Sequence, residues 1–296
     1  MLSMATTDRR TFIKATVGGI AFSQVLPPLI NATPLTPNLS IIMGAGVNVL
    51  ALTTPEGVVM VDGGLPENSQ TLLQTVKGTV HTLFNTCWFP EITGSNLTLG
   101  PAGVTIIAHE NTRLWMTTDI TRPWERRTFP PAPKEARPNK TFYDKGAITV
   151  GNERIEYGYL LQAHTDGDIY VFFPKANVLA IGGIVSKTEW PLIDWWTGGW
   201  IGGLVNALEA LLKIGDAQTR IVTAQGPIMT RAELQAQHEM YRTINTRLQQ
   251  LIRKGRSPDE AVAAQPTKEF NDKMGNSDFF VRLAFQSLWG QLSPDA

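Results

Sequence analysis

Short apolar runs typical of β-strands alternate with helical runs twice along this chain. In the first block, three strands within residues 38–64 precede a helix at 66–77, strands at 80–85 and 104–109, and a helix at 110–116. In the second block, strands at 148–162, 169–174 and 177–185 precede a helix at 200–215 and a strand at 220–226. The pattern predicts an α/β domain of two stacked sheets with helices outside.

The remainder of the chain reads as a helical tail. Thr230 with Glu233, and Ser257 with Glu260, have the spacing of capping boxes that begin helices. Five apolar residues after the first box recur at helical spacing and predict a buried stripe: Tyr241, Ile244, Leu248, Leu251 and Ile252. By contrast, the proline-rich segment 121–141 is expected to be a long surface excursion.

The first residues have the layout of a twin-arginine export signal. Arg9 and Arg10 are followed by Phe12 and Lys14, and then by a weakly apolar run too short to span a bilayer. Small residues allow cleavage after Ser23 or Ala32. We therefore expect a signal and short linker at 1–33 and a single domain at 34–296. This interpretation predicts a periplasmic protein that folds before export. Its mature form is expected to have no stable membrane span.

Composition narrows the classes of function. The 296 residues carry 26 Lys and Arg against 26 Asp and Glu, so the charge balance gives no reason to expect nucleic acid as a partner. Cys87 is the one cysteine, which excludes an intramolecular disulfide. The chain has no nucleophile elbow, phosphate-binding loop or dinucleotide-binding fingerprint.

Several segments in order carry a family resemblance. They are VVMVDGG at 58–64, NTCWFPEITGSN at 85–96, QAHTDGDIYVFFPKANVLAIGG at 162–183, PLIDWWTGGWIGGLVNALEALL at 191–212 and RIVTAQGPIMT at 220–230. From about Asn38 onward the chain resembles metallo-β-lactamase-fold hydrolases. The resemblance implies a four-layer αββα sandwich. It also implies one or two zinc ions held by an HxHxDH loop, a later His, a bridging Asp and a final His, with a zinc-bound water as the nucleophile.

The ligand positions implied by this resemblance are almost all altered. The HxHxDH positions hold Cys87, Phe89, Glu91 and Ile92, the bridging Asp position holds Gly183, and the final His position holds Gln225. His164 alone keeps the family residue. Neither half of the site retains the three protein ligands that a catalytic zinc needs. Phe89 and Ile92 instead favour apolar packing, because buried imidazoles without a metal would be unpaired polar groups.

We therefore expect a pseudoenzyme without a cofactor that binds an unidentified small ligand or protein partner. The alternative is an atypical mononuclear hydrolase that uses zinc bound by Cys87, Glu91 and His164. A Cys87–His164 thiol dyad is a further alternative, although the flanking Trp88 and Phe89 disfavour a thiolate. A subunit that regulates an active zinc-containing relative is another. Asp62 and His109 are expected to be structural.

A cluster of tryptophans is the feature that the zinc chemistry does not explain. Four of the chain's eight lie within eleven residues: Trp190, Trp195, Trp196 and Trp200. In the resembling family this segment lies near the mouth of the active site. Exposed indoles there would form a surface for a ligand or partner, whereas buried ones would cover the emptied cavity.

Overall fold

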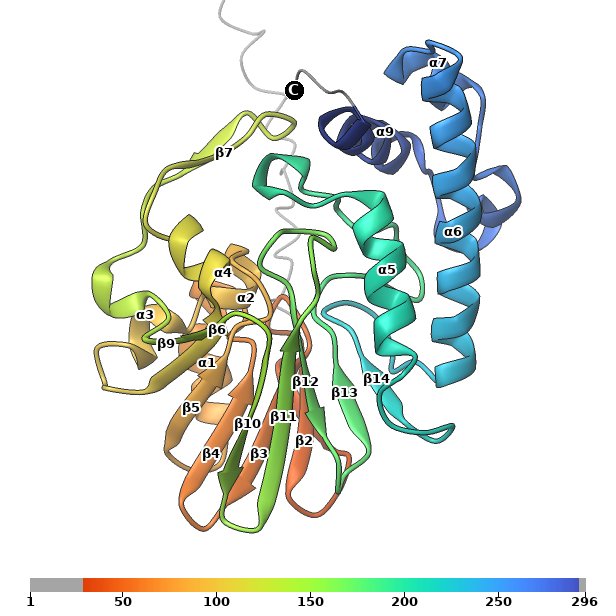
Figure 1. Ribbon diagram of the computed structural model, residues 1–296. Coiled ribbons are helices and arrows are strands. Elements are labelled where there is room, and N and C mark those ends of the chain that lie inside the picture. Colours follow the sequence, from red (N-terminus) through yellow and green to blue (C-terminus); the bar gives the residue numbers. More distant parts are fainter. Residues whose placement is uncertain (1–28, 293–296) are drawn as a thin grey trace, which may run out of the picture.

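The computed structural model describes residues 29–292, with side chains as far as residue 289 (Figure 1). The arginine pair and Ser23 lie outside the described residues. Strand β1 (Asn31–Pro34) already pairs antiparallel with β2 (Leu39–Met43), so the first sheet begins three residues before the domain boundary expected at residue 34. Cleavage after Ala32 would cut through this edge strand.

The first sheet has seven strands in the order β1-β2-β3-β4-β5-β6-β9. The remaining members are β3 (Val49–Thr54), β4 (Gly57–Val61), β5 (Val80–Phe84), β6 (Thr105–His109) and β9 (Lys140–Phe142). The pairs β1–β2, β2–β3 and β3–β4 are antiparallel, whereas β4–β5, β5–β6 and β6–β9 are parallel. The parallel strand ends therefore gather at one edge, where loops can build a site.

The second sheet has five strands in the order β10-β11-β12-β13-β14. They are β10 (Lys145–Val150), β11 (Glu153–Tyr159), β12 (Ile169–Phe173), β13 (Val178–Ala180) and β14 (Arg220–Val222). Only β13 and β14 are parallel, because α5 (Ile201–Leu211) crosses between them. The loops after β13 and β14 consequently reach the same edge as those of the first sheet.

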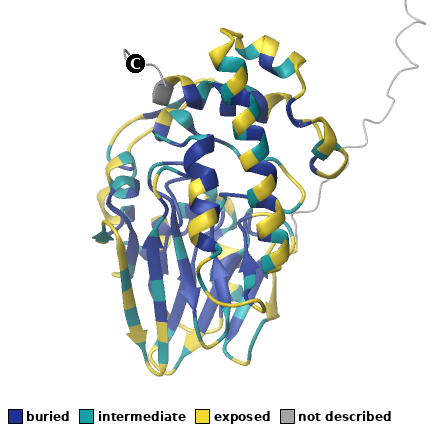
Figure 2. Cartoon of the chain, turned by 45° about the vertical axis from the view of Figure 1, so that its right-hand side comes forward, coloured by how far each residue is buried: buried dark blue, intermediate teal, exposed yellow. Residues whose placement is uncertain are grey.

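Alternating side chains divide the core into layers. In the first sheet Leu50 and Leu52 face the second sheet, whereas Val49 and Ala51 face the helices on the other side. Three buried clusters result: one between the sheets, one outside the first sheet and one outside the second. Figure 2 shows buried strands behind helices that expose one face. The expected αββα sandwich is confirmed.

Helices cover both outer faces. The first half carries η1 (Pro66–Asn68), α1 (Ser69–Thr75), α2 (Pro90–Thr93), α3 (Asn96–Leu99), α4 (Glu110–Trp115) and η2 (Lys134–Ala136). The second half carries η3 (Trp195–Thr197), α5, α6 (Arg231–Arg253), α7 (Pro258–Ala263), η4 (Lys268–Phe270), α8 (Asn271–Met274) and α9 (Asp278–Leu292). Figure 1 shows α5 and α6 packed side by side against the second sheet, with α9 beyond them.

The helical tail follows the sequence pattern closely. Both predicted capping boxes begin helices, with Thr230 at the start of α6 and Ser257 at the start of α7. Tyr241, Ile244 and Leu248 are fully buried, and the last two residues of the stripe are partly buried against the same cluster. Of the helices described, none is both long and apolar enough to cross a bilayer.

The segment 121–141 is more structured than the sequence indicates. A hairpin forms from β7 (Ile120–Arg122) and β8 (Arg127–Phe129), and β9 adds a parallel edge strand beside β6. Most of the segment is exposed, as expected for a surface excursion, but the prediction missed these strands. Proline content obscured three short strands, of which β7 carries a buried arginine, Arg122.

Candidate functional site

The loops at the strand ends enclose a pocket of about 180 Å³. Its wall contains six of the seven ligand positions implied by the family resemblance: Phe89, Glu91, Ile92, His164, Gly183 and Gln225. The seventh, Cys87, is fully buried and lies against His164. The fold thus brings together the residues that the sequence places at ligand positions, although only one of them is an imidazole.

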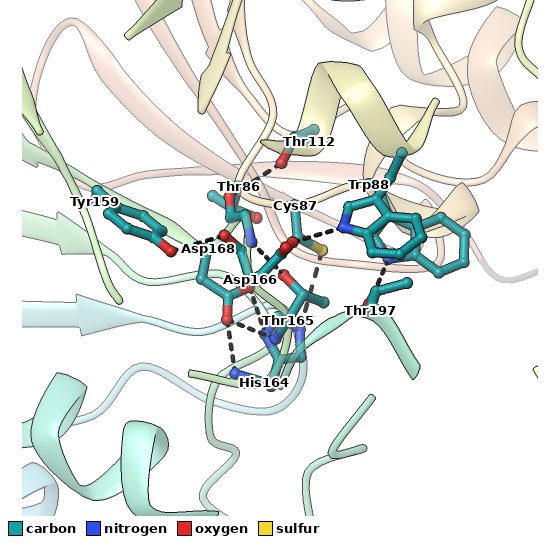
Figure 3. Close-up of polar contacts among 12 residues, drawn as sticks. Thr86, Cys87, Trp88, Thr112, Tyr159, His164, Thr165, Asp166, Asp168 and Thr197 are labelled. Atoms are coloured by element: carbon teal, nitrogen blue, oxygen red, sulfur yellow. Dashed lines mark hydrogen bonds and ion pairs between the residues drawn. The ribbon is translucent and has the colours of Figure 1, made fainter. Parts of the chain in front are cut away.

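His164 is held by Asp168 (Figure 3). Its Nδ1 lies 2.6 Å from Asp168 Oδ1, although the ring N–H is not well aligned with that oxygen. Asp168 Oδ2 accepts the backbone N–H groups of His164 and Thr165 at 2.6 and 2.8 Å, and Oδ1 accepts the Thr165 hydroxyl at 2.8 Å. Both carboxylate oxygens are therefore engaged within this loop, and they orient the imidazole.

Cys87 meets the other ring nitrogen of the same histidine. Its Sγ lies 3.9 Å from His164 Nε2, and no part of the residue is exposed. Burial raises the pKa of the Cys87 thiol well above its ordinary value, and the nearby charge of Asp168 raises that pKa further. The group is accordingly a neutral thiol within weak hydrogen-bonding distance of the imidazole, which is the opposite of an activated nucleophile.

A buried Cys/His/Asp cluster therefore lies beneath the pocket. One donor atom each from Cys87, His164 and Asp168 lies within 4.8 Å of the others. With Zn–S near 2.3 Å and Zn–N near 2.0 Å, tetrahedral ligands are about 3.5 Å apart, so the Cys87–His164 separation comes close to a zinc pair. Asp168 could become the third ligand only by releasing its hydrogen bonds. Glu91, expected in this role, lines the pocket and is not part of the group.

These residues do not fit a catalytic zinc centre, which requires three protein ligands and an open position for water. Phe89, at the position of a missing ligand, is 5% exposed and meets His164 edge-on with ring centroids 5.0 Å apart. Ile92 is buried beside it. Gln225 donates from Nε2 to the Gly46 carbonyl at 2.6 Å, so its amide holds the neighbouring loop.

Arg122 is a site residue that sequence reasoning missed. Its guanidinium carbon lies 4.0 Å from the centroid of the Phe89 ring and 4.8 Å from that of Trp88. Nη1 donates to Glu125 at 3.0 Å, and Nε lies 3.9 Å from Asp194 Oδ2. Asp194 is itself buried, and its backbone N–H donates to the His164 carbonyl at 2.9 Å. The β7–β8 hairpin thus positions the buried Arg122 cation behind Phe89. The local sequence around Arg122 contains no motif that would predict this position.

Two further carboxyl groups lie near the cluster: Asp62 is buried and Asp166 is partly buried. Asp62 accepts the backbone N–H and the hydroxyl of Thr86 at 2.9 and 3.0 Å, in agreement with the expected structural role. Burial raises the pKa of Asp62 to about 7. Asp166 accepts from Trp115 Nε1 at 2.6 Å, and burial raises its pKa to about 6. Because a raised pKa favours the neutral acid, protonation of these two groups would reduce the negative charge around the cluster.

The four clustered tryptophans do not share one surface. Trp190 lines the pocket, stacks on Phe280 at 4.7 Å and donates from Nε1 to the Gly275 carbonyl. Trp195 and Trp196 lie in η3, where only Trp196 is largely exposed, at 46%. Trp200 precedes α5 and packs its ring over Gly202. One indole therefore belongs to the pocket wall.

Comparisons with known proteins identify solved structures of similar architecture. The chain matches no protein-family model, and it has no significant sequence match to a curated protein. A metallo-beta-lactamase from Pontibacter korlensis superposes with a TM-score of 0.58 at 17% identity over 72% of this chain and 99% of that one. The DIM-1 metallo-beta-lactamase gives 0.59 at 16% identity, over 73% and 98%.

A larger solved structure covers more of the chain. The stereoselective inverting sec-alkylsulfatase Pisa1 from Pseudomonas sp. superposes with a TM-score of 0.67 at 13% identity, over 90% of this chain. The match spans 50% of that enzyme. At such identities the likeness concerns architecture alone. Together with the two sheets and their covering helices, it establishes that this chain has the metallo-β-lactamase fold.

Proposed function

We propose that this chain is a non-hydrolytic member of the fold that binds a small ligand in the pocket where relatives of this architecture would hold metal. One observation supports the proposal most strongly. At three of the ligand positions that line this pocket, Phe89 has an aromatic ring, Ile92 has an aliphatic side chain, and Gly183 has no side chain. None of these three can ligate a metal or move a proton.

The remaining polar groups support the same conclusion. His164 is engaged by Asp168 on one side and faces a neutral thiol on the other, so the cluster contains no activated nucleophile. The pocket wall is largely apolar, as in most small-molecule sites, although its volume of about 180 Å³ is below the common range of about 300–1,000 Å³. A ligand of few atoms is therefore favoured.

The buried Cys/His/Asp cluster supports a second candidate, a mononuclear metal-dependent hydrolase. Here zinc would be held by Cys87, His164 and Asp168 after Asp168 had released Thr165. Zinc would supply Lewis acidity and an activated water. The chain's contribution would be to orient the imidazole and to exclude bulk water.

Metal content distinguishes the two candidates. Protein expressed with ample zinc and purified without chelators should contain far less than one metal ion per chain. It should also show no EDTA-sensitive hydrolysis of ester, β-lactam or sulfate-ester substrates. About one zinc or iron per chain that is lost in a His164→Ala variant would establish the second candidate instead.

Ligand binding is tested separately by saturation-transfer NMR with a set of small neutral and charged fragments. Ala224 lines the pocket, so an Ala224→Leu variant should fill it and lose the bound fragments. Ala147→Leu, on the exposed side of β10, is the matched control. Identical fragment binding by the wild type and the filled variant would contradict the proposed function.

We also propose that the protein is exported through the twin-arginine pathway, on the basis of Arg9, Arg10, Phe12 and Lys14. Replacement of both arginines by lysine should retain the protein in the cytoplasmic fraction of a bacterial host, whereas the wild type should reach the periplasm. Equal periplasmic amounts of the two proteins would contradict this proposal.

A further inference from the structure

We infer that the pocket selects a small alkylammonium ion, an inference that rests on the proposed ligand-binding function. The first observation is the sign of its charge. Glu91 and Glu189 line the pocket, and its wall contains no lysine or arginine. Within residues 29–289, neither carboxylate has an ion-pair partner, and neither side chain makes a hydrogen bond.

The neighbouring cations are already engaged elsewhere. Lys187, close to Glu189 in sequence, places Nζ 2.5 Å from Glu233 Oε1. Arg122 lies behind Phe89, where it contacts Glu125 and Asp194. Neither residue lines the pocket. Glu91 is partly buried and Glu189 is exposed. The two pocket carboxylates therefore retain a charge that a bound cation would neutralise.

Aromatic surface is the second, independent observation. Trp190 and Phe89 both line the pocket, and an ammonium ion is attracted to the faces of such rings. Phe280 covers one face of Trp190, and Arg122 already lies over Phe89, which is 5% exposed. Trp190 therefore supplies most of the aromatic surface. The methyl groups of an alkylated ammonium also suit the apolar wall formed by Val47, Ile92 and Leu192.

Size restricts the ligand further. A pocket of about 180 Å³ holds the equivalent of about six water molecules at about 30 Å³ each. That space accommodates one organic cation of roughly seven non-hydrogen atoms but no large substrate. An anion of the same size would meet two carboxylates without a compensating cation, and a neutral molecule would leave both carboxylates unpaired.

The test compares two probes of the same shape that differ in charge. Choline and its neutral carbon analogue 3,3-dimethylbutan-1-ol are titrated into the purified protein, with binding followed by tryptophan fluorescence and calorimetry. We expect choline to bind at least about tenfold more tightly. Glu91→Gln and Glu189→Gln should each weaken choline binding severalfold and leave binding of the alcohol unchanged. Glu135→Gln, at an exposed site in η2, is the control.

The outcomes separate this inference from the function on which it rests. Equal or tighter binding of the alcohol would refute selection for a cation while leaving a ligand-binding pocket in place. Failure of both probes would refute the inference, and the fragment comparison with Ala224→Leu would then decide the proposed function independently. Loss of choline binding in Glu135→Gln as well would show that the effect arises from general surface charge.

Discussion

A side-chain carbon at Gly183 would lie 2.8 Å from Nε2 of His164. The position at which the resemblance implies a bridging Asp is therefore occupied by the imidazole edge, and the present packing depends on glycine there. Restoring a single ligand residue would not restore the site, because the histidine has taken up the space.

Gly183→Ala should lower the free energy of unfolding by about 1–3 kcal/mol, the usual effect of forcing an extra carbon against a packed side chain. Urea denaturation measures this change. Because the overlap is with the ring, combining it with His164→Ala should give less than the sum of the single effects. Strict additivity would show that the strain lies elsewhere. Gly183→Asp should be at least as destabilising and should not increase zinc binding.

Cys87 should be unreactive in the folded protein. Its thiol is fully buried and its pKa is raised, so little thiolate is present at pH 8. A colorimetric disulfide reagent should titrate no thiol in native protein and one thiol per chain in urea. Because Cys87 is the single cysteine, the signal has one source. Rapid native labelling would indicate an accessible thiolate and would revive the Cys87–His164 dyad.

Arg122 should be far more important for stability than a surface arginine. Arg122→Met removes the cation beside buried Asp194 and should lower the free energy of unfolding by about 3–5 kcal/mol. Asp194→Asn in the same chain should recover part of that loss, because it removes the uncompensated charge. Arg154→Met, which breaks an exposed pair with Glu156, should change stability by about 1 kcal/mol or less.

If the two single variants at residues 122 and 194 prove additive, Arg122 acts through its stacking on Phe89 and Trp88 alone. Chemical denaturation of the four proteins in this cycle measures the coupling energy directly. A coupling close to zero would contradict the electrostatic role assigned to Arg122.

Asp62 should make stability depend on pH. Its pKa is about 7 in the folded protein and about 3.9 in an unfolded chain, so the folded state binds more protons between these values. Stability should therefore fall as pH rises from about 4 to 7, by an amount on the order of a few kcal/mol. Asp166 and Asp194 have pKa values raised in the same direction and add to the slope.

The contribution of Asp62 is isolated by comparison with Asp62→Asn, which keeps an acceptor for the Thr86 N–H. The difference in unfolding free energy between the two proteins should change across this pH window and become constant above it. Parallel curves throughout would show that Asp62 titrates normally in the folded protein.

Much of the architecture could be predicted because it depends on local patterns. Short apolar runs bounded by turn residues, as at 49–54 and 57–61, predict strands, and the capping boxes at Thr230 and Ser257 predict where helices begin. The short strands β7, β8 and β9 were not predicted, because the prolines and charges around them obscure a pairing that depends on neighbouring strands. The brief helices α2 and α3 were also missed, because turns of four residues carry little periodicity.

By itself the sequence determined which residues stand at the altered ligand positions, and therefore that six of seven are not the residues implied by the resemblance. Only the tertiary structure decided what replaced them. His164 contacts Asp168, whereas Glu91, which was expected beside it as a metal ligand, does not join this cluster. Arg122 lies behind Phe89, and Glu91 and Glu189 line a small pocket. The reason is physical: side-chain identity is local, whereas a pocket, a buried ion pair or a ligand set depends on distances between strands far apart in the chain.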